Sequence, residues 1–144
     1  METATMGKVL VKATIENMQD LWEVKNGTRK PEDVRRLEVP DALMDTGARM
    51  LSLPLKYIQA LGLEYVETRT SMTAAGKPPA DIYRLVQFTL MDRQCPLDVA
   101  AVPDDCPVLI GQIPLERLDL VVDPARQRLI GDPAHGGEFM IELY

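Results

Sequence analysis

Histidine and cysteine are scarce in this sequence, and their scarcity excludes several kinds of catalytic site. The 144 residues include one histidine and two cysteines. A zinc site with several histidine ligands is therefore impossible, and two cysteines do not complete a set of four ligands. A Ser-His-Asp triad would depend on His135, which lies in the glycine-rich segment 131–138. A glycine-rich phosphate-binding loop is also missing. Any catalysis must rest mainly on carboxylates, and we expect no metal and no cofactor.

The sequence also lacks long apolar runs and an excess of basic residues. No apolar stretch approaches the roughly 20 residues that span a bilayer. The formal net charge is −6, which argues against binding to nucleic acid or to an anionic membrane surface, since both depend on basic patches. The first residues show no basic region followed by an apolar core, so we expect no signal peptide and a cytoplasmic location. In that compartment Cys95 and Cys106 are expected to be reduced.

What the sequence contains is typical of one globular domain spanning residues 1–144. Hydrophobic residues make up 46% and charged residues 26% of the chain, which suits a single core. Alternating and short apolar segments predict strands over residues 7–16, 37–44, 50–53, 63–73, 81–90, 95–102, 107–111, 119–122 and 127–130. Short helices are predicted over residues 54–61, where Gly62 is placed to end the helix, and over residues 112–118. The fold class is therefore all-β, a small β-barrel or sandwich with one or two short helices.

Three segments stand outside this pattern. Residues 17–30 are polar and contain a turn signal, and the Trp22 within them is expected to cover an edge of the core. Residues 31–36 could form one helical turn, with proline at its first position. The tail, residues 132–144, ends in an apolar segment that either pairs with another chain as an interface strand or packs on its own domain.

The stretch most suggestive of chemistry is residues 41–54, DALMDTGARMLSLP. An apolar strand leads into Asp45, Thr46 and Gly47, and a second apolar strand follows. Such a loop can hold a carboxylate in a fixed place with its oxygens facing a cleft. The alternative is an ordinary turn aspartate on a β-hairpin, which the loop alone would fit about as well.

Residues 45–48, Asp-Thr-Gly-Ala, resemble the active-site loop of the retropepsin-like aspartic proteases, single-domain relatives of pepsin found in retroviruses and bacteria. The order of later features is similar too. A helix ends at Leu-Gly-Leu (61–63), a hairpin is tipped by Ala-Gly-Lys (75–77), and Leu-Ile-Gly (109–111) precedes a helix. Residues 118–124, LDLVVDP, resemble a segment common in bacterial members. The resemblance covers residues 37–131 and implies a closed β-barrel of the retropepsin type.

The resemblance also implies a mechanism and its residues. It implies an aspartic endopeptidase acting as a homodimer, in which each subunit contributes one catalytic aspartate and an extended peptide is the substrate. The implied catalytic residues are Asp45, Thr46 and Gly47. The residues implied to support the loop are Ala48, Leu109, Ile110 and Gly111. The implied flap, which would close over the substrate, contains Ala74, Ala75, Gly76 and Lys77.

Two departures from the family pattern favour a second interpretation. Retroviral members usually carry an acidic residue after the Asp-Thr-Gly-Ala loop, paired with an arginine after the later glycine, but here these positions hold Arg49 and Gln112. Residues 17–36 are also longer than the family minimum and are expected to form an added lobe. The alternative function is therefore a dimeric, non-proteolytic domain of the same fold that binds peptides or proteins.

Overall fold

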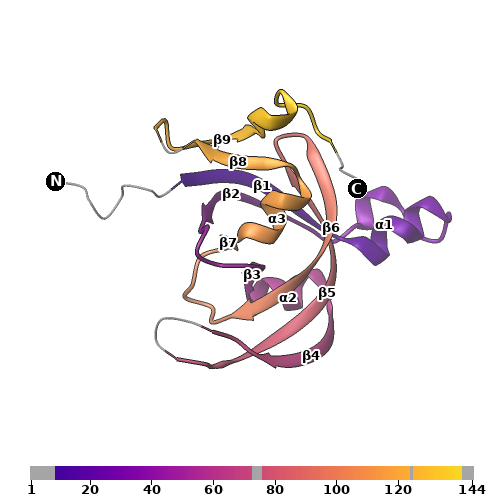
Figure 1. Ribbon diagram of the computed structural model, residues 1–144. Coiled ribbons are helices and arrows are strands. Elements are labelled where there is room, and N and C mark those ends of the chain that lie inside the picture. Colours follow the sequence, from indigo (N-terminus) through magenta and orange to yellow (C-terminus); the bar gives the residue numbers. More distant parts are fainter. Residues whose placement is uncertain (1–8, 73–75, 124, 141–144) are drawn as a thin grey trace.

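The computed structural model describes residues 9–72, 76–123 and 125–140, and Figure 1 shows how its elements are arranged. The strands are β1 (Val9–Asn17), β2 (Arg36–Met44), β3 (Leu51–Pro54), β4 (Glu64–Thr70), β5 (Pro79–Leu90), β6 (Arg93–Val102), β7 (Leu109–Ile110), β8 (Leu120–Asp123) and β9 (Arg128–Gly131). The α-helices are α1 (Met18–Lys25), α2 (Leu55–Leu61) and α3 (Gln112–Arg117), and the 3₁₀ turns are η2 (Pro31–Asp33) and η3 (Pro133–His135).

Six strands close into a barrel, which confirms the predicted fold class. Their order is β1-β2-β7-β3-β6-β5, and β5 returns to pair with β1. The closing register runs antiparallel, with Ile15 opposite Phe88. Strand β4 pairs with the other end of β5, over residues 79–84, and so extends the sheet as a hairpin arm outside the closed ring (Figure 1). Closure leaves the six ring strands without the unpaired edges that promote aggregation.

The barrel interior is filled by the inward residues of the alternating strands. The side chains of Ile15, Leu53, Phe88, Val99 and Ile110 are fully buried and belong to one continuous core. Each such side chain contributes about 1.5 to 3 kcal/mol of burial free energy. The helices α2 and α3 pack buried apolar residues onto the same core.

Helix α2 ends as the sequence predicts, because Gly62 adopts the left-handed conformation with φ of 66°. Helix α1 was not predicted, since residues 17–30 were described only as a polar segment with a turn signal. The side chain of Asn17 accepts a hydrogen bond from the Asp20 N–H and thereby caps the start of this helix. The helix has no apolar stripe of helical period, because its buried side carries the carboxylate of Asp20.

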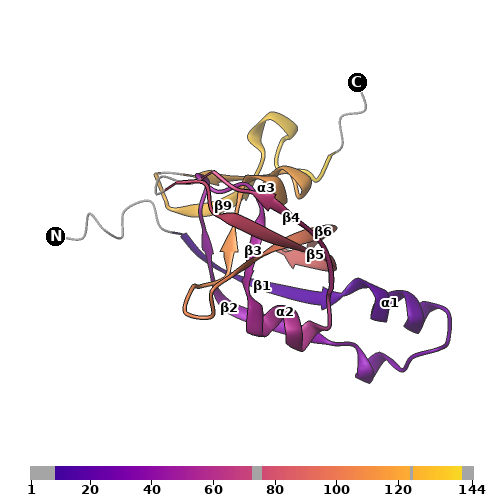
Figure 2. The ribbon, with the colours of Figure 1, turned by 90° about the horizontal axis from the view of Figure 1, so that it is seen from below.

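That carboxylate fixes the segment from α1 to η2 to the barrel. Asp20 is fully buried, and its oxygens accept two hydrogen bonds from the Arg35 guanidinium, at 2.8 and 2.9 Å. The hydrogen bond from Arg35 holds the pKa of Asp20 below its usual value. Asn17 donates a 2.7 Å hydrogen bond to the carbonyl oxygen of Leu61 at the end of α2. The segment projects from one side of the barrel (Figures 1 and 2).

The strands β8 and β9 form a separate two-stranded sheet, and the chain then runs into the tail. Within the described part of the tail, up to Met140, there is one turn of 3₁₀ helix, η3, and no strand. The rest of the predicted apolar strand, residues 141–144, lies outside the described residues. The Arg93 guanidinium donates to the carbonyl oxygens of Leu118, Asp119 and Gly137, and so holds the tail against the barrel. None of the helices in the described ranges is long and apolar enough to cross a membrane.

Candidate active site

Asp45 stands at the carboxyl end of β2 with its side chain exposed. Its N–H donates a 3.0 Å hydrogen bond to the Ile110 carbonyl, and its own carbonyl accepts a 3.0 Å bond from the Ala48 N–H, which closes a tight turn. The Gly47 N–H donates a 3.0 Å hydrogen bond to the Asp45 Oδ1 atom. The backbone of the aspartate is therefore fixed, while its carboxylate faces solvent with one oxygen oriented by its own loop.

The two-residue strand β7 determines where this loop lies. It is inserted between β2, to which it is parallel, and β3, to which it is antiparallel. Because the Asp45 loop connects β2 to β3, it must pass over the end of β7, where Ile110 is fully buried. Leu109 and Ile110 thus lie directly beside the loop.

The loop is also bonded to the first turn of α3. The carbonyl oxygens of residues 48, 49 and 50 accept hydrogen bonds from the N–H groups of Gln112 at 3.0 Å, Ile113 at 2.8 Å and Gly111 at 3.2 Å. These donors belong to a helix start and would otherwise lack partners. Sequence reasoning did not find this arrangement, because backbone carbonyls leave no signal in residue types.

Gly111 allows the close approach of loop and helix. A Cβ atom at this position would lie 2.5 Å from the carbonyl carbon of Arg49 and 2.7 Å from the carbonyl oxygens of Arg49 and Met50. Real Cβ atoms do not approach backbone atoms so closely, so only glycine fits here without moving the loop.

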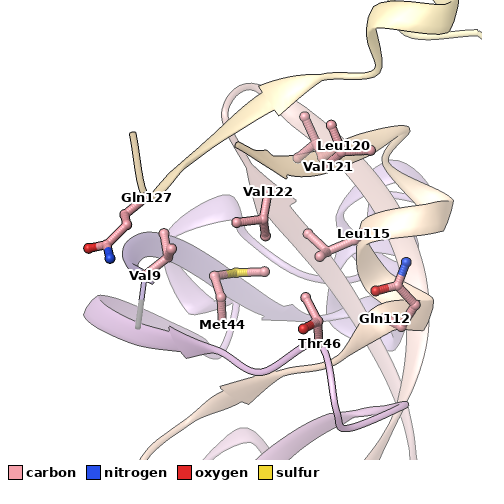
Figure 3. Close-up of a pocket in the computed structure, with 9 residues that line it drawn as sticks. All are labelled: Val9, Met44, Thr46, Gln112, Leu115, Leu120, Val121, Val122 and Gln127. Atoms are coloured by element: carbon pink, nitrogen blue, oxygen red, sulfur yellow. The ribbon is translucent and has the colours of Figure 1, made fainter. Parts of the chain in front are cut away.

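An apolar groove of about 390 Å³ lies next to the loop (Figure 3). It runs between the loop and the β8–β9 sheet, with the polar residues Thr46 and Gln112 at one end and Gln127 at the other. The residues that line it are Val9, Met44, Thr46, Gln112, Leu115, Leu120, Val121, Val122 and Gln127.

The predicted hairpin is present, and its arms are β4 and β5. Ser71 closes the described part of the hairpin, since its N–H and its hydroxyl both donate to the Pro78 carbonyl, at 2.9 and 2.6 Å. Ala74 and Ala75 lie outside the described residues, whereas Gly76, with φ of 139°, and Lys77 are exposed. The hairpin arms and the β2–β3 loop point to the same side of the barrel (Figures 1 and 2).

The two positions that depart from the family pattern lie close to Asp45 in the fold. Arg49 is exposed and forms no ion pair within residues 9–72, 76–123 and 125–140. Gln112 is neutral and begins α3. The two positions of the acid–arginine pair in the retroviral pattern thus hold a neutral residue and a cation that has no ion pair in the described part of the chain.

Among the described residues, one group could be considered for a metal ion: Asp119, Asp132 and His135, whose ligand atoms lie within 4.8 Å of one another. These side chains already form hydrogen bonds within the protein. Asp119 Oδ2 contacts His135 Nδ1 at 2.7 Å and accepts from the Met140 N–H at 3.1 Å, while Asp132 accepts from the Ala134 N–H. The hydrogen bond to His135 lowers the pKa of Asp119. The cluster anchors the tail and lies outside the Asp45 loop.

The chain is similar to a protein family and to solved structures. The family model described as aspartyl protease matches residues 32–130, which include the Asp45 loop, the hairpin, β7 and α3. Among solved structures, the protease of simian foamy virus (mac) is 20% identical, with 74% of this chain and 93% of that chain covered and a TM-score of 0.43. The EIAV protease, solved with the inhibitor HBY-793, is 19% identical, with 56% and 75% covered and a TM-score of 0.39. No curated protein matches the sequence.

Proposed function

The chain belongs to the aspartyl protease family, and from that premise we propose that it is an aspartic endopeptidase acting as a symmetric homodimer. The observation that carries the proposal is the Asp45 loop. It holds an exposed carboxylate on a backbone fixed by hydrogen bonds to β7 and α3. Catalytic groups need this kind of fixed geometry, because a displacement of about 1 Å can cost about 100-fold in rate.

A second carboxylate is required for the chemistry. Without a metal or a covalent nucleophile, one group must take a proton from water while another gives a proton to the peptide carbonyl. Two carboxylates at close range do both, because they cannot ionise together at neutral pH and so share one proton. The sequence contains one Asp-Thr-Gly motif, so a second copy of the chain must supply the other Asp45. A twofold axis between the loops would make the two acids equivalent.

The roles of the neighbouring residues follow from their positions. The ionised Asp45 would take the water proton, and the protonated Asp45 of the other copy would donate to the substrate carbonyl and later to the leaving amine. The Gly47 N–H, which donates to Oδ1, would orient the carboxylate. Thr46 would bond across the axis. The groove that Thr46 lines would then border the second copy.

The substrate would lie extended between the loop and the hairpin. The hairpin, with Gly76 and Lys77 on its described side, would act as the flap that excludes water. An extended peptide would bind through backbone hydrogen bonds, as an added strand does. Ala48, Leu109, Ile110 and Gly111 would hold the floor of the cleft.

One observation favours the alternative, a non-proteolytic binding domain. Arg49 places a cation four residues from Asp45 with no carboxylate partner among the described residues. A cation near the two acids favours their ionised forms and so opposes the sharing of a proton. In that case the dimer and the cleft would persist without turnover.

The test is a subunit-mixing experiment on a random peptide pool, from about pH 4 to about pH 7.5. Asp45→Asn alone should be inactive but folded and dimeric. After subunit exchange, an equal mixture of the variant and wild type should keep about one quarter of the activity of wild type at the same total protein concentration. The reason is that a mixed dimer lacks one acid. A site contained in one chain would instead keep about one half. Cleavage by a monomer would contradict the dimer mechanism. A folded wild-type dimer that binds peptides without cutting them would establish the alternative.

A further inference from the structure

The proposed catalytic scheme does not use Arg49, an exposed cation beside the Asp45 loop that has no ion-pair partner among the described residues. We propose that Arg49 makes the protein selective for peptides with an acidic side chain two or three residues from the scissile bond, on either side of it. This inference rests on the proposed function, since it assigns a substrate class to the same cleft.

The backbone of Arg49 is held rigidly from two sides. Its carbonyl oxygen accepts the 2.8 Å hydrogen bond from the Ile113 N–H, and Gly111 packs directly against its carbonyl group. The side chain, in contrast, is exposed. The fixed backbone limits the region that this side chain can reach to the surroundings of the loop.

Arg49 has no carboxylate partner among the described residues. Six arginines lie within 4.0 Å of a carboxylate, namely Arg29, Arg35, Arg36, Arg69, Arg84 and Arg126. Arg93 and Arg117 donate to backbone carbonyl oxygens instead, and Arg128 is like Arg49 in having neither kind of partner in the described part of the chain. The net charge of −6 supplies an excess of acids, yet none in the described part of the chain reaches Arg49. Its neighbour across the loop, Gln112, is neutral. The guanidinium is thus left available for a carboxylate that comes from outside the subunit.

The distance along the chain from Asp45 to Arg49 indicates which substrate residue the Arg49 side chain can reach. The turn from Asp45 to Ala48 brings those Cα atoms within about 7 Å, and Arg49 lies one residue further, about 3.8 Å. Arg49 is therefore within about 11 Å of Asp45, measured between Cα atoms. An extended peptide advances about 3.3 Å per residue, so this distance covers about three residues. The twofold axis would place a second Arg49 at the same distance on the other side.

Guanidinium is well suited to this role. It presents a planar set of donors that can bind both oxygens of a carboxylate at once. Lys77, an exposed cation on the hairpin with no ion pair among residues 76–123, would add to the same preference from the opposite side of the cleft.

The experiment compares two octapeptides with apolar residues at the scissile bond. One carries Glu as the third residue on each side of that bond, and the other carries Gln. Wild type should cleave the Glu peptide with about tenfold higher kcat/KM, the range expected for hydrogen bonds to a charged group. Arg49→Gln should remove the preference, and Arg49→Lys should keep part of it. Lys25→Gln, which removes the same charge on α1 at the far side of the barrel, should behave as wild type (Figure 1).

A binding measurement separates this inference from the proteolytic proposal. The Asp45→Asn protein is titrated with both peptides, and tighter binding of the Glu peptide, lost on adding Arg49→Gln, supports the inference even if wild type cuts neither. Equal binding and equal cleavage of the two peptides would overturn it. So would a weaker dimer in Arg49→Gln by sedimentation with an unchanged preference, because Arg49 would then be pairing with the second copy.

Discussion

Gly111→Ala should show how much the site depends on the contact between the loop and α3. The added Cβ would lie 2.5 Å from the carbonyl carbon of Arg49, whereas ordinary contact begins at 3.4 Å. The loop must therefore retreat by about 0.9 Å. Gly111 itself has φ of −87° and ψ of −169°, which alanine adopts freely. The effect is thus one of contact rather than of backbone strain.

The magnitude follows from the bonds that the shift stretches. Three loop carbonyls accept N–H groups of residues 111–113 at 2.8 to 3.2 Å. Each weakened hydrogen bond should cost about 1 kcal/mol. Alanine also stiffens the unfolded chain, which returns about 0.5 kcal/mol. The free energy of unfolding should therefore fall by about 2 to 3 kcal/mol in total. If Asp45 moves with its loop, kcat/KM should fall about 100-fold. Urea unfolding and peptide cleavage measure the two effects.

Gly131→Ala is the matched control. Its Cβ would clash with the Gly137 carbonyl in the tail, a comparable steric conflict in a different place. It should lower stability but leave kcat/KM within about twofold. The reasoning would be refuted if Gly111→Ala kept wild-type stability and activity, or if the two variants lost activity equally.

Further predictions concern buried groups. Asp20→Ala should lower the free energy of unfolding by about 2 to 3 kcal/mol in urea, because it leaves Arg35 without its carboxylate. Since the pKa of Asp20 is lowered in the folded protein, this contribution is complete above its unfolded pKa of 3.8 and is lost as the pH falls through the folded value. A difference between the variant and wild type that grew with acidification would contradict this assignment. Burial raises the pKa of the Cys95 thiol to about 11, while Cys106 is half-buried. Iodoacetamide at about pH 8 should therefore label only Cys106 in the folded protein, by mass spectrometry, and rapid labelling of both would show that the core opens.

Most strands and two helices could be predicted because each has a local cause. The alternation of Val9, Ala13 and Ile15 predicts β1, and Gly62 predicts the end of α2. The Asp45 loop was identified by its motif together with the order of later features. The pairing of β7 between β2 and β3 has no local signal, since two apolar residues fit many partners.

Helix α1 shows what pattern reasoning misses. Its buried side contains Asp20, which a hydrophobic pattern treats as surface. Its partner Arg35 lies 15 residues away along the chain, so only the fold brings the charges together. The sequence did contain one signal for this helix. Asn17, three residues before Asp20, is a residue type that commonly caps the start of a helix. The tail contacts of Arg93 were equally invisible, because they join a guanidinium to distant backbone carbonyls.

The hydrogen bond from Asp45 to Ile110 joins residues far apart in sequence, as do the bonds from the loop to α3. Contacts of such long range form late, because the intervening chain must first be brought together. During synthesis the aspartate emerges well before its supports, so the loop has no fixed shape until nearly the whole domain has been made. A nascent or truncated chain would carry the Asp-Thr-Gly motif without a formed site. The topology therefore leaves the Asp-Thr-Gly segment without its supporting hydrogen bonds until β7 and α3 have been made.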